Sequence, residues 1–279
     1  FLVDMNEGRI INDEEIKSKI VTDRPYQEWL DKYRLHLKDV PSTSEVCSIE
    51  TIDLATRERL FNYTLEDIQD VITPMAQSGK ETLGSMGTDT PLAVLSDRPQ
   101  LISNYFKQLF AQVTNPPLDG IREEIVTDIS LNLGQDRNIF DISSKQCRKL
   151  RIQNPVISNK DLEKIRAIAI DHFHAETFSI LYPKSKGLNG LEDTLEALIV
   201  QVTKAVENGT NIIILSDRGV NKDLAPIPSL LACSYVNHQM NRLRKRSYFD
   251  IIIESAEPRE PHHFATLFGY GASAINPYM

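Results

Sequence analysis

The second half of the sequence alternates short apolar runs with longer helical patterns, and this alternation limits the fold more than any other feature. The runs are rich in β-branched residues and lie at 150–157, 177–181, 212–215 and 251–253, with a further strand expected from Ala274. Helical patterns follow them from Asn159 and at 191–207, 228–246 and 263–268. Such runs are typical of strands buried on both faces of a parallel sheet. The pattern predicts an α/β fold.

The number of strand–helix units limits the kind of sheet. Four or five units can be counted, whereas a closed barrel of this type needs eight. The units occupy residues 141–279, after a loop at 138–144. Residues 42–140 hold short helical patterns instead, and residues 1–41 are charged, helix-rich and followed by a Pro-Ser-Thr-Ser linker. We therefore expect two regions, 1–41 and 42–279, the second with an α-rich part and a βα-repeat part.

The charge balance bears on the class of partner. The chain has 31 basic and 39 acidic residues and a net charge of −8, whereas nucleic-acid-binding domains usually carry a basic face. One basic run, 242–246, is typical of the solvated last turn of a helix. No apolar run approaches the roughly 18 residues of a membrane span. The sequence therefore predicts neither a nucleic acid nor a membrane as partner.

The cysteines and histidines indicate neither disulfides nor a metal centre. Cys47, Cys147 and Cys233 are scattered and odd in number, which favours reduced thiols in the cytoplasm. The two histidine pairs lack the i, i+4 spacing of a helical metal pair, so packing or hydrogen bonding is expected of them: His172 with His174, and His262 with His263.

Polar residues follow several of the expected strands at their carboxyl ends, where parallel α/β sheets bind ligands. They are Ser179, Ser216 to Gly219, and Glu254 with Arg259 shortly after. Asp217 and Glu254 could form a general acid/base pair, with Arg218 binding an anionic substrate. The same three residues could instead form a structural ion-pair network between neighbouring strand ends. Both interpretations are open at this point.

A second notable stretch lies at 84–134. Pro99 is expected to open a helix whose apolar stripe contains Leu101, Ile102, Tyr105, Phe106, Leu109 and Phe110. The sequence Thr114-Asn115-Pro116-Pro117 then follows, and a helix is unfavourable there because Asn115 precedes a proline. The periodicity predicts a packed helix that ends in a rigid polar corner.

The amino-acid sequence of this stretch closely resembles that of the central domain of the large subunit in the glutamate synthase family. The resemblance lies in GSMGTDTP at 84–91 and YFKQLFAQVTNPP at 105–117. Residues 1–20, FLVDMNEGRIINDEEIKSKI, resemble the tail of that family's amidotransferase domain. Residues 257–279, EPREPHHFATLFGYGASAINPYM, resemble the close of its central domain.

The resemblance implies a degenerate, TIM-barrel-like domain between an amidotransferase domain and an FMN-binding domain of one parent chain. The parent reaction converts glutamine and 2-oxoglutarate to two glutamates. The resemblance also implies that the catalytic cysteine, the FMN and the iron–sulfur cluster belong to other parts of the parent. This chain would then hold no cofactor and no complete active site, and would be inactive alone.

The resemblance also implies a role for the polar corner. It places Thr114 in the wall of the ammonia tunnel that joins the two active sites, and we extend this expectation to Asn115. The rival expectation is a free-standing α/β enzyme that uses Asp217, Arg218 and Glu254. The reductant of the parent, whether ferredoxin, NADH or NADPH, is not decided by these residues.

Overall fold

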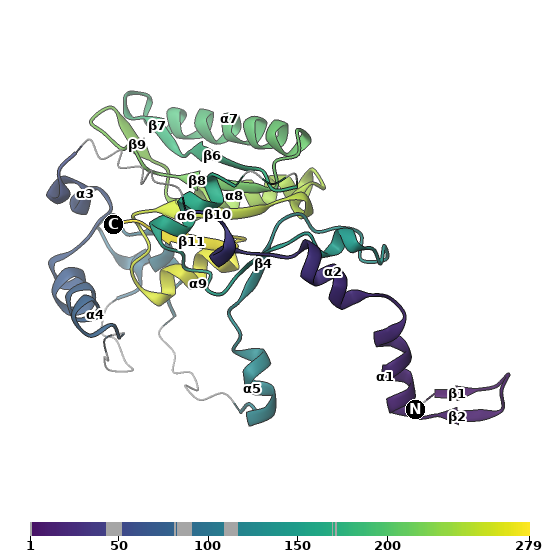
Figure 1. The fold of residues 1–279 in the computed structure, drawn as a ribbon. Coiled ribbons are helices and arrows are strands. Elements are labelled where there is room, and N and C mark those ends of the chain that lie inside the picture. Colours follow the sequence, from purple (N-terminus) through teal and green to yellow (C-terminus); the bar gives the residue numbers. More distant parts are fainter. Residues whose placement is uncertain are drawn as a thin grey trace.

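A four-stranded parallel sheet lies at the centre of the computed structural model, which describes residues 2–42, 52–80, 82, 91–108, 117–168, 170 and 172–279. Its order is β11-β10-β8-β6. The strands are β6 (Ala175–Ser179), β8 (Ile212–Ser216), β10 (Asp250–Ser255) and β11 (Ala274–Pro277). All three pairs are parallel. The predicted α/β fold with a parallel sheet is confirmed (Figure 1).

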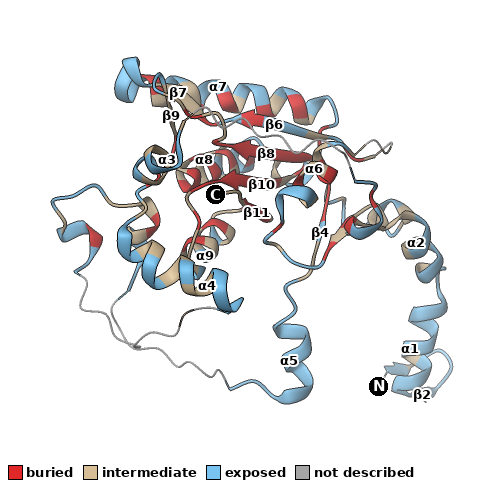
Figure 2. Ribbon diagram, turned by 60° about the vertical axis from the view of Figure 1, so that its left-hand side comes forward, coloured by how far each residue is buried: buried red, intermediate tan, exposed pale blue. Residues whose placement is uncertain are grey.

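Both faces of the sheet are buried, as the continuous apolar runs require. Ile213, Leu215 and Ile251 face a core to which α7 (Gly187–Glu207), α8 (Ser229–Arg242) and α9 (Pro261–Gly269) contribute. Ile212 and Ile214 face a second core formed with α6 (Asn159–Arg166) and with residues 37–40. Figure 2 shows β8 and β10 in red between these layers.

A smaller sheet packs at the second core. It has the order β3-β5-β4, with β3 parallel and β4 antiparallel to the middle strand. Its strands are β3 (Leu35–His36), β4 (Leu131–Leu133) and β5 (Leu150–Ile152). The apolar run at 150–157 therefore does not continue the main sheet as a full strand. Its last residues touch the edge of that sheet, where Val156 forms a parallel bridge with Ile275.

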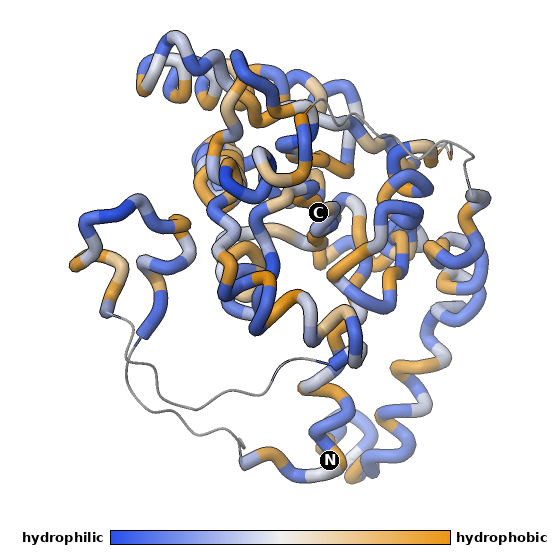
Figure 3. The backbone as a smooth tube through the Cα atoms, turned by 90° about the vertical axis from the view of Figure 1, so that its left-hand side faces the viewer, coloured by the Kyte–Doolittle hydropathy of each residue, from blue (hydrophilic) through white to orange (hydrophobic). Residues whose placement is uncertain are grey.

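The N-terminal region projects away from the main sheet (Figure 1). It comprises the antiparallel pair β1 (Leu2–Asp4) and β2 (Arg9–Ile11), then α1 (Asp13–Thr22) and α2 (Tyr26–Tyr33). Neither α1 nor α2 has a buried residue. Apolar and polar residues are interspersed along this arm in Figure 3. The chain reaches the body at β3 and the 3₁₀ turn η1 (Leu37–Asp39), where Leu37 joins the second core.

Short helical elements dominate the described part of 52–140. They are α3 (Leu54–Leu60), the π-helical η2 (Asp67–Ile72), α4 (Thr73–Ser78), the 3₁₀ turns η3 (Ala93–Leu95) and η4 (Ile102–Phe106), and α5 (Gly120–Val126). A reciprocal capping box precedes η2, since Thr64 N–H donates to Asp67 and Asp67 N–H donates to the Thr64 hydroxyl. Within the described residues the helix expected from Pro99 is instead a 3₁₀ turn that ends at Phe106, and the backbone is extended at Lys107. Leu109 and Phe110 of the expected stripe lie outside the described residues.

The remaining elements connect strands and helices of the βα part. They are η5 (Ser144–Cys147), β7 (Leu181–Pro183), η6 (Lys184–Lys186), β9 (Leu224–Pro226) and η7 (Arg246–Tyr248), and β7 pairs with β9. The basic run at 242–246 was expected to be the solvated last turn of a helix. For Arg246 this expectation is wrong. Its guanidinium donates to Asn237 Oδ1 and to the carbonyls of Phe249 and Gly271. These contacts give the side chain partners within the chain that the basic run in the sequence does not reveal.

The resemblance implied a TIM-barrel-like domain, and the observed sheet confirms only the α/β part of that expectation. Within the described residues the main sheet is open, with β6 and β11 at its edges. The structure therefore supports an α/β fold with a parallel sheet, and no closed barrel forms in this part of the chain. The domain boundaries at 41 and 140 stay predictions.

Arg259 joins the short helical elements to the βα part. Its guanidinium donates to the carbonyl of Asn62 (2.7 Å), pairs with Asp67 (3.0 Å) and stacks over the ring of Tyr63 (4.3 Å). The side chain is 7% exposed, so these contacts replace water. Tyr63 in turn donates to the carbonyl of Ala256 (2.7 Å).

We expect Arg259→Ala to loosen residues 54–78 while the main sheet stays protected. The change removes several charge-assisted contacts, worth about 2 kcal/mol together with their burial. Hydrogen exchange should therefore accelerate in 54–78 by on the order of tenfold or more. Arg242→Ala at the exposed end of α8 is the control and should change nothing. Equal exchange in the two variants would contradict the assignment.

Candidate functional site

A buried carboxylate at the end of β10 holds two arginines from different elements. Glu254 is 1% exposed. Arg218 Nε donates to its Oε1 (2.6 Å) from the loop after β8, and Arg166 Nη2 donates to its Oε2 (2.8 Å) from the end of α6. Arg166 also pairs with Glu163 one turn earlier in the same helix. The two guanidinium groups compensate the buried charge of Glu254.

A second buried carboxylate lies beside it but has different partners. Asp217 is fully buried and accepts from the hydroxyls of Ser255 (2.5 Å) and Tyr278 (2.6 Å). The Ala256 N–H also points at it (3.3 Å). Burial raises the pKa of Asp217 to about 7, although the hydroxyl donors oppose this rise. Its environment favours a carboxyl that holds its proton near neutral pH.

The two carboxylates are joined through an aromatic ring. The Arg218 guanidinium stacks on the ring of Tyr278, 3.9 Å from its centroid, while the Tyr278 hydroxyl binds Asp217. The backbone N–H of Asp217 donates to the Glu254 carbonyl (3.1 Å). Nearby, Asn276 donates to the Ile157 carbonyl and to Asn159 Oδ1 (both 2.9 Å). We call Arg166, Asp217, Arg218, Glu254 and Tyr278 the strand-end cluster.

The contacts in the strand-end cluster agree with part of the sequence prediction. The expected pair of Arg218 with Glu254 exists, but Asp217 binds Ser255 and Tyr278 instead of joining that ion pair. The three expected residues therefore divide into two hydrogen-bonded groups. An acid/base role for them is untested by this geometry and stays a prediction.

The other residues expected at the strand ends make local contacts. The hydroxyl of Ser216 accepts from the N–H of Arg218 (3.2 Å), and that of Ser179 accepts from the N–H of Leu181 (3.3 Å). Arg259 contacts the short helical elements instead of the strand-end cluster. Sequence reasoning missed Arg166 and Tyr278, because nothing in a helical arginine or a tyrosine near the end of the sequence indicates its distant partner.

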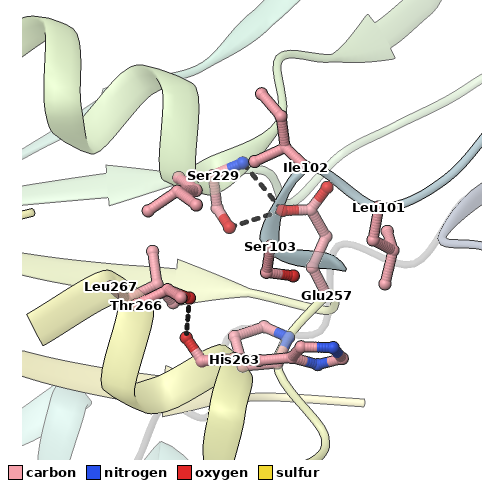
Figure 4. A pocket seen from close by; sticks show the side chains of 10 residues that line it. Leu101, Ile102, Ser103, Ser229, Glu257, His263, Thr266 and Leu267 are labelled. Atoms are coloured by element: carbon pink, nitrogen blue, oxygen red, sulfur yellow. Dashed lines mark hydrogen bonds between the residues drawn. The ribbon is translucent and has the colours of Figure 1, made fainter. Parts of the chain in front are cut away.

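A small pocket lies between η4, the start of α8 and α9 (Figure 4). Its volume of about 20 Å³ is enough for a single water. Glu257 lines it and accepts from the N–H of Ser229 (2.7 Å) and from its hydroxyl. Burial raises the pKa of Glu257. His263 also lines the pocket, as Figure 4 shows, and its Nε2 lies 3.1 Å from Glu260. The pocket is too small for an organic substrate.

The cysteines do not fit an iron–sulfur cluster. Such clusters usually take four cysteine thiolates, and the chain contains three cysteines. Cys233 is buried in the core, and burial raises the pKa of its thiol to about 12, so it stays neutral. Among the described residues no three His, Cys, Asp or Glu side chains gather where they could hold a metal ion.

Two predicted site residues lie outside the described residues. Thr114 and Asn115 belong to 109–116, between the described ranges 91–108 and 117–168. The described flanks are Lys107, which is extended, and Asp119, whose carboxylate caps α5 by accepting from Ile121 N–H (2.9 Å). Their expected place in a tunnel wall stays a prediction.

Comparison with known protein families identifies the family of this chain. A family model for the glutamate synthase central domain matches residues 56–279 of this chain. The chain belongs to the glutamate synthase family. The predicted resemblance is therefore confirmed, and it extends over both the short helical elements and the βα part. The strand-end cluster lies entirely within the matched range.

Curated relatives of the glutamate synthase family align with almost the whole chain. It is 44% identical to the glutamate synthase [NADPH] large chain of Bacillus subtilis over 100% of this chain and 18% of that protein. It is 38% identical to the glutamate synthase [NADH] of Schizosaccharomyces pombe, over 100% of this chain and 14% of that protein. It is 35% identical to the ferredoxin-dependent glutamate synthase 2 of Synechocystis, over 99% and 18%. The chain spans less than a fifth of each relative.

These relatives carry three different reductants in their names, so the likeness does not choose among NADPH, NADH and ferredoxin for this chain. Within the described residues, none of the helices combines the length and the apolar character that crossing a membrane requires.

Proposed function

We propose that this chain serves as the central, non-catalytic domain of a glutamate synthase, which converts glutamine and 2-oxoglutarate to two glutamates. In this role it connects the amidotransferase and FMN-binding domains of one parent chain and forms part of the ammonia tunnel between them. The family match over residues 56–279 carries the proposal. The FMN and the iron–sulfur cluster belong to other parts of the parent, and the chain alone is inactive.

The organisation of the chain supports a connecting role. The N-terminal arm, whose helices α1 and α2 have no buried residue, is proposed to be the tail of the amidotransferase domain. The open parallel sheet is proposed to derive from a degenerate barrel. The scattered cysteines favour the cytoplasm as the location of the parent.

The strand-end cluster supports a structural role over the alternative of a free-standing enzyme. Glu254 is bound by two arginines and Asp217 by two hydroxyls, all from this chain. Both carboxylates are buried, with 1% and 0% exposure. A general acid or base must come within hydrogen-bond reach of its substrate. We propose that these internal partners take the place that a substrate would otherwise need.

A tunnel wall gives a physical reason for the Thr114-Asn115-Pro116-Pro117 corner. Ammonia must cross without meeting bulk water, so its path needs a stiff backbone, which two prolines provide. A threonine hydroxyl and an asparagine amide can exchange hydrogen bonds with ammonia and have no acidic proton to give it. We propose that Thr114 faces the path and that Asn115 lies beside it.

The experiment compares two rates in an intact glutamate synthase that contains this chain. Coupled turnover consumes about one 2-oxoglutarate for each glutamine hydrolysed. We expect Thr114→Leu to block the path, so that this ratio falls at least tenfold while glutamine hydrolysis continues. Thr114→Ser keeps the hydroxyl and should stay coupled. An unchanged ratio in Thr114→Leu would refute the tunnel assignment.

A further inference from the structure

A pocket of about 330 Å³ lies on the side of the molecule away from α7 and α8, against the second core. Its walls come from residues 36–38, from β5 and the loop after it, and from α6. The volume falls in the range of pockets that bind small molecules. None of these residues belongs to the strand-end cluster or to the Thr114-Asn115 corner.

Lys164 gives this pocket its most unusual feature. The residue is 9% exposed, and burying a charged ammonium is costly unless acceptors surround it. Its Nζ lies 3.5 Å from the carbonyl of Leu37 and 3.7 Å from the carboxylate of Asp161. Both distances exceed those of ordinary hydrogen bonds, about 2.7–3.2 Å. The contacts of the ammonium with these two oxygen atoms are therefore weak. The ammonium can donate to an anion that comes closer.

Further basic groups line the same pocket. Arg151 contributes a guanidinium that donates to the hydroxyl of Ser130 and lies 3.6 Å from the carboxylate of Asp128, and Lys38 and His36 also line the pocket. Asp161 is the one acidic residue of the lining. Its carboxylate accepts from the Ser158 hydroxyl (2.8 Å) at the start of α6 and keeps its negative charge. The three basic side chains of Lys38, Arg151 and Lys164 outnumber the carboxylates of Asp161 and Asp128, so the balance of charge favours an anion.

Apolar side chains complete the lining. Leu37, Ile152, Val156 and Ile157 also line the pocket. A pocket with an apolar wall and a few convergent charges suits an organic body that carries an anionic group. We propose that this pocket binds a small organic anion, a carboxylate or a phosphate, with Lys164 and Arg151 as its principal ligands. The bound anion would also tie residues 36–38 to α6.

The test is titration calorimetry on the 279-residue chain with two probes, succinate and inorganic phosphate, at constant ionic strength against chloride. We expect saturable binding of at least one probe and a loss of affinity of at least tenfold in Lys164→Gln and in Arg151→Gln. Preference for succinate would indicate a carboxylate ligand, and preference for phosphate a phosphorylated one. Lys160→Gln, on the exposed side of α6, is the matched control.

Two results would overturn the proposal. One is the absence of saturable binding of both probes by the wild-type chain. The other is binding that Lys164→Gln and Lys160→Gln weaken equally, because a general effect of positive charge would then explain it. Circular dichroism spectra of each variant establish that it is folded, and Arg151→Gln tests the pocket independently if Lys164→Gln is unstable. The test does not depend on the proposed role of the chain in ammonia transfer.

Discussion

Replacement of Glu254 by alanine is expected to lower the free energy of unfolding by about 3–5 kcal/mol, the usual cost of removing one partner of a buried ion pair. The carboxylate is 1% exposed and compensates both Arg166 and Arg218. Without it, two guanidinium groups would face each other at the end of β10, with side chains only 25% and 12% exposed. Urea unfolding followed by circular dichroism measures the change.

The matched control is an exposed ion pair of the same chain. Asp13 and Lys17 pair across one turn of α1, with side chains 66% and 72% exposed. Asp13→Asn should therefore change the free energy of unfolding by less than about 0.5 kcal/mol. A loss below about 1 kcal/mol in Glu254→Ala would contradict the structural importance of the strand-end cluster.

Asp217 is expected to make the stability of the chain depend on pH. Its pKa is about 7 in the folded chain and 3.8 as a free side chain, with burial as the main cause. Between these values the folded chain holds a proton that the unfolded chain releases, so stability falls as pH rises from about 4 to about 7. One carboxyl shifted this far contributes up to about 4 kcal/mol.

Asp217→Asn removes this contribution, because an amide does not titrate. Relative to wild type, the variant should gain stability steadily between pH 4 and pH 7, and denaturant unfolding across that range measures the difference. Asp250 and Glu257 also have raised pKa values, so the wild-type curve alone does not isolate Asp217. Parallel curves for the variant and wild type would contradict a protonated Asp217.

The alternation of apolar runs with helical patterns was sufficient to predict the strands of the main sheet. Runs such as 212–215 and 251–253 are so uniformly apolar that burial on both faces is their one favourable environment. The capping of η2 by Thr64 and Asp67 is also a local feature, because the two residues are three positions apart. These features depend on neighbours within a few residues, which a sequence displays directly.

Features that depend on distant partners were beyond this reasoning. Glu254 and Arg166 are 88 residues apart, and no spacing rule joins a strand end to a helix end at that separation. The stripe at 101–110 favours an α-helix by periodicity, yet residues 102–106 form a 3₁₀ turn in which the partly buried Ile102 packs against the core of α7 and α8. Tertiary packing there outweighs the helical pattern.

The most direct test of a non-catalytic role is the turnover of Asp217→Asn in an intact glutamate synthase that contains this chain. The amide keeps the size of the buried carboxyl, so the fold should persist, and thermal unfolding of the same preparation establishes this. If the strand-end cluster is structural, kcat for glutamate formation and the rate of glutamine hydrolysis should both stay within about twofold of wild type. A folded variant whose kcat falls by on the order of a hundredfold or more would contradict this account and make Asp217 a catalytic residue.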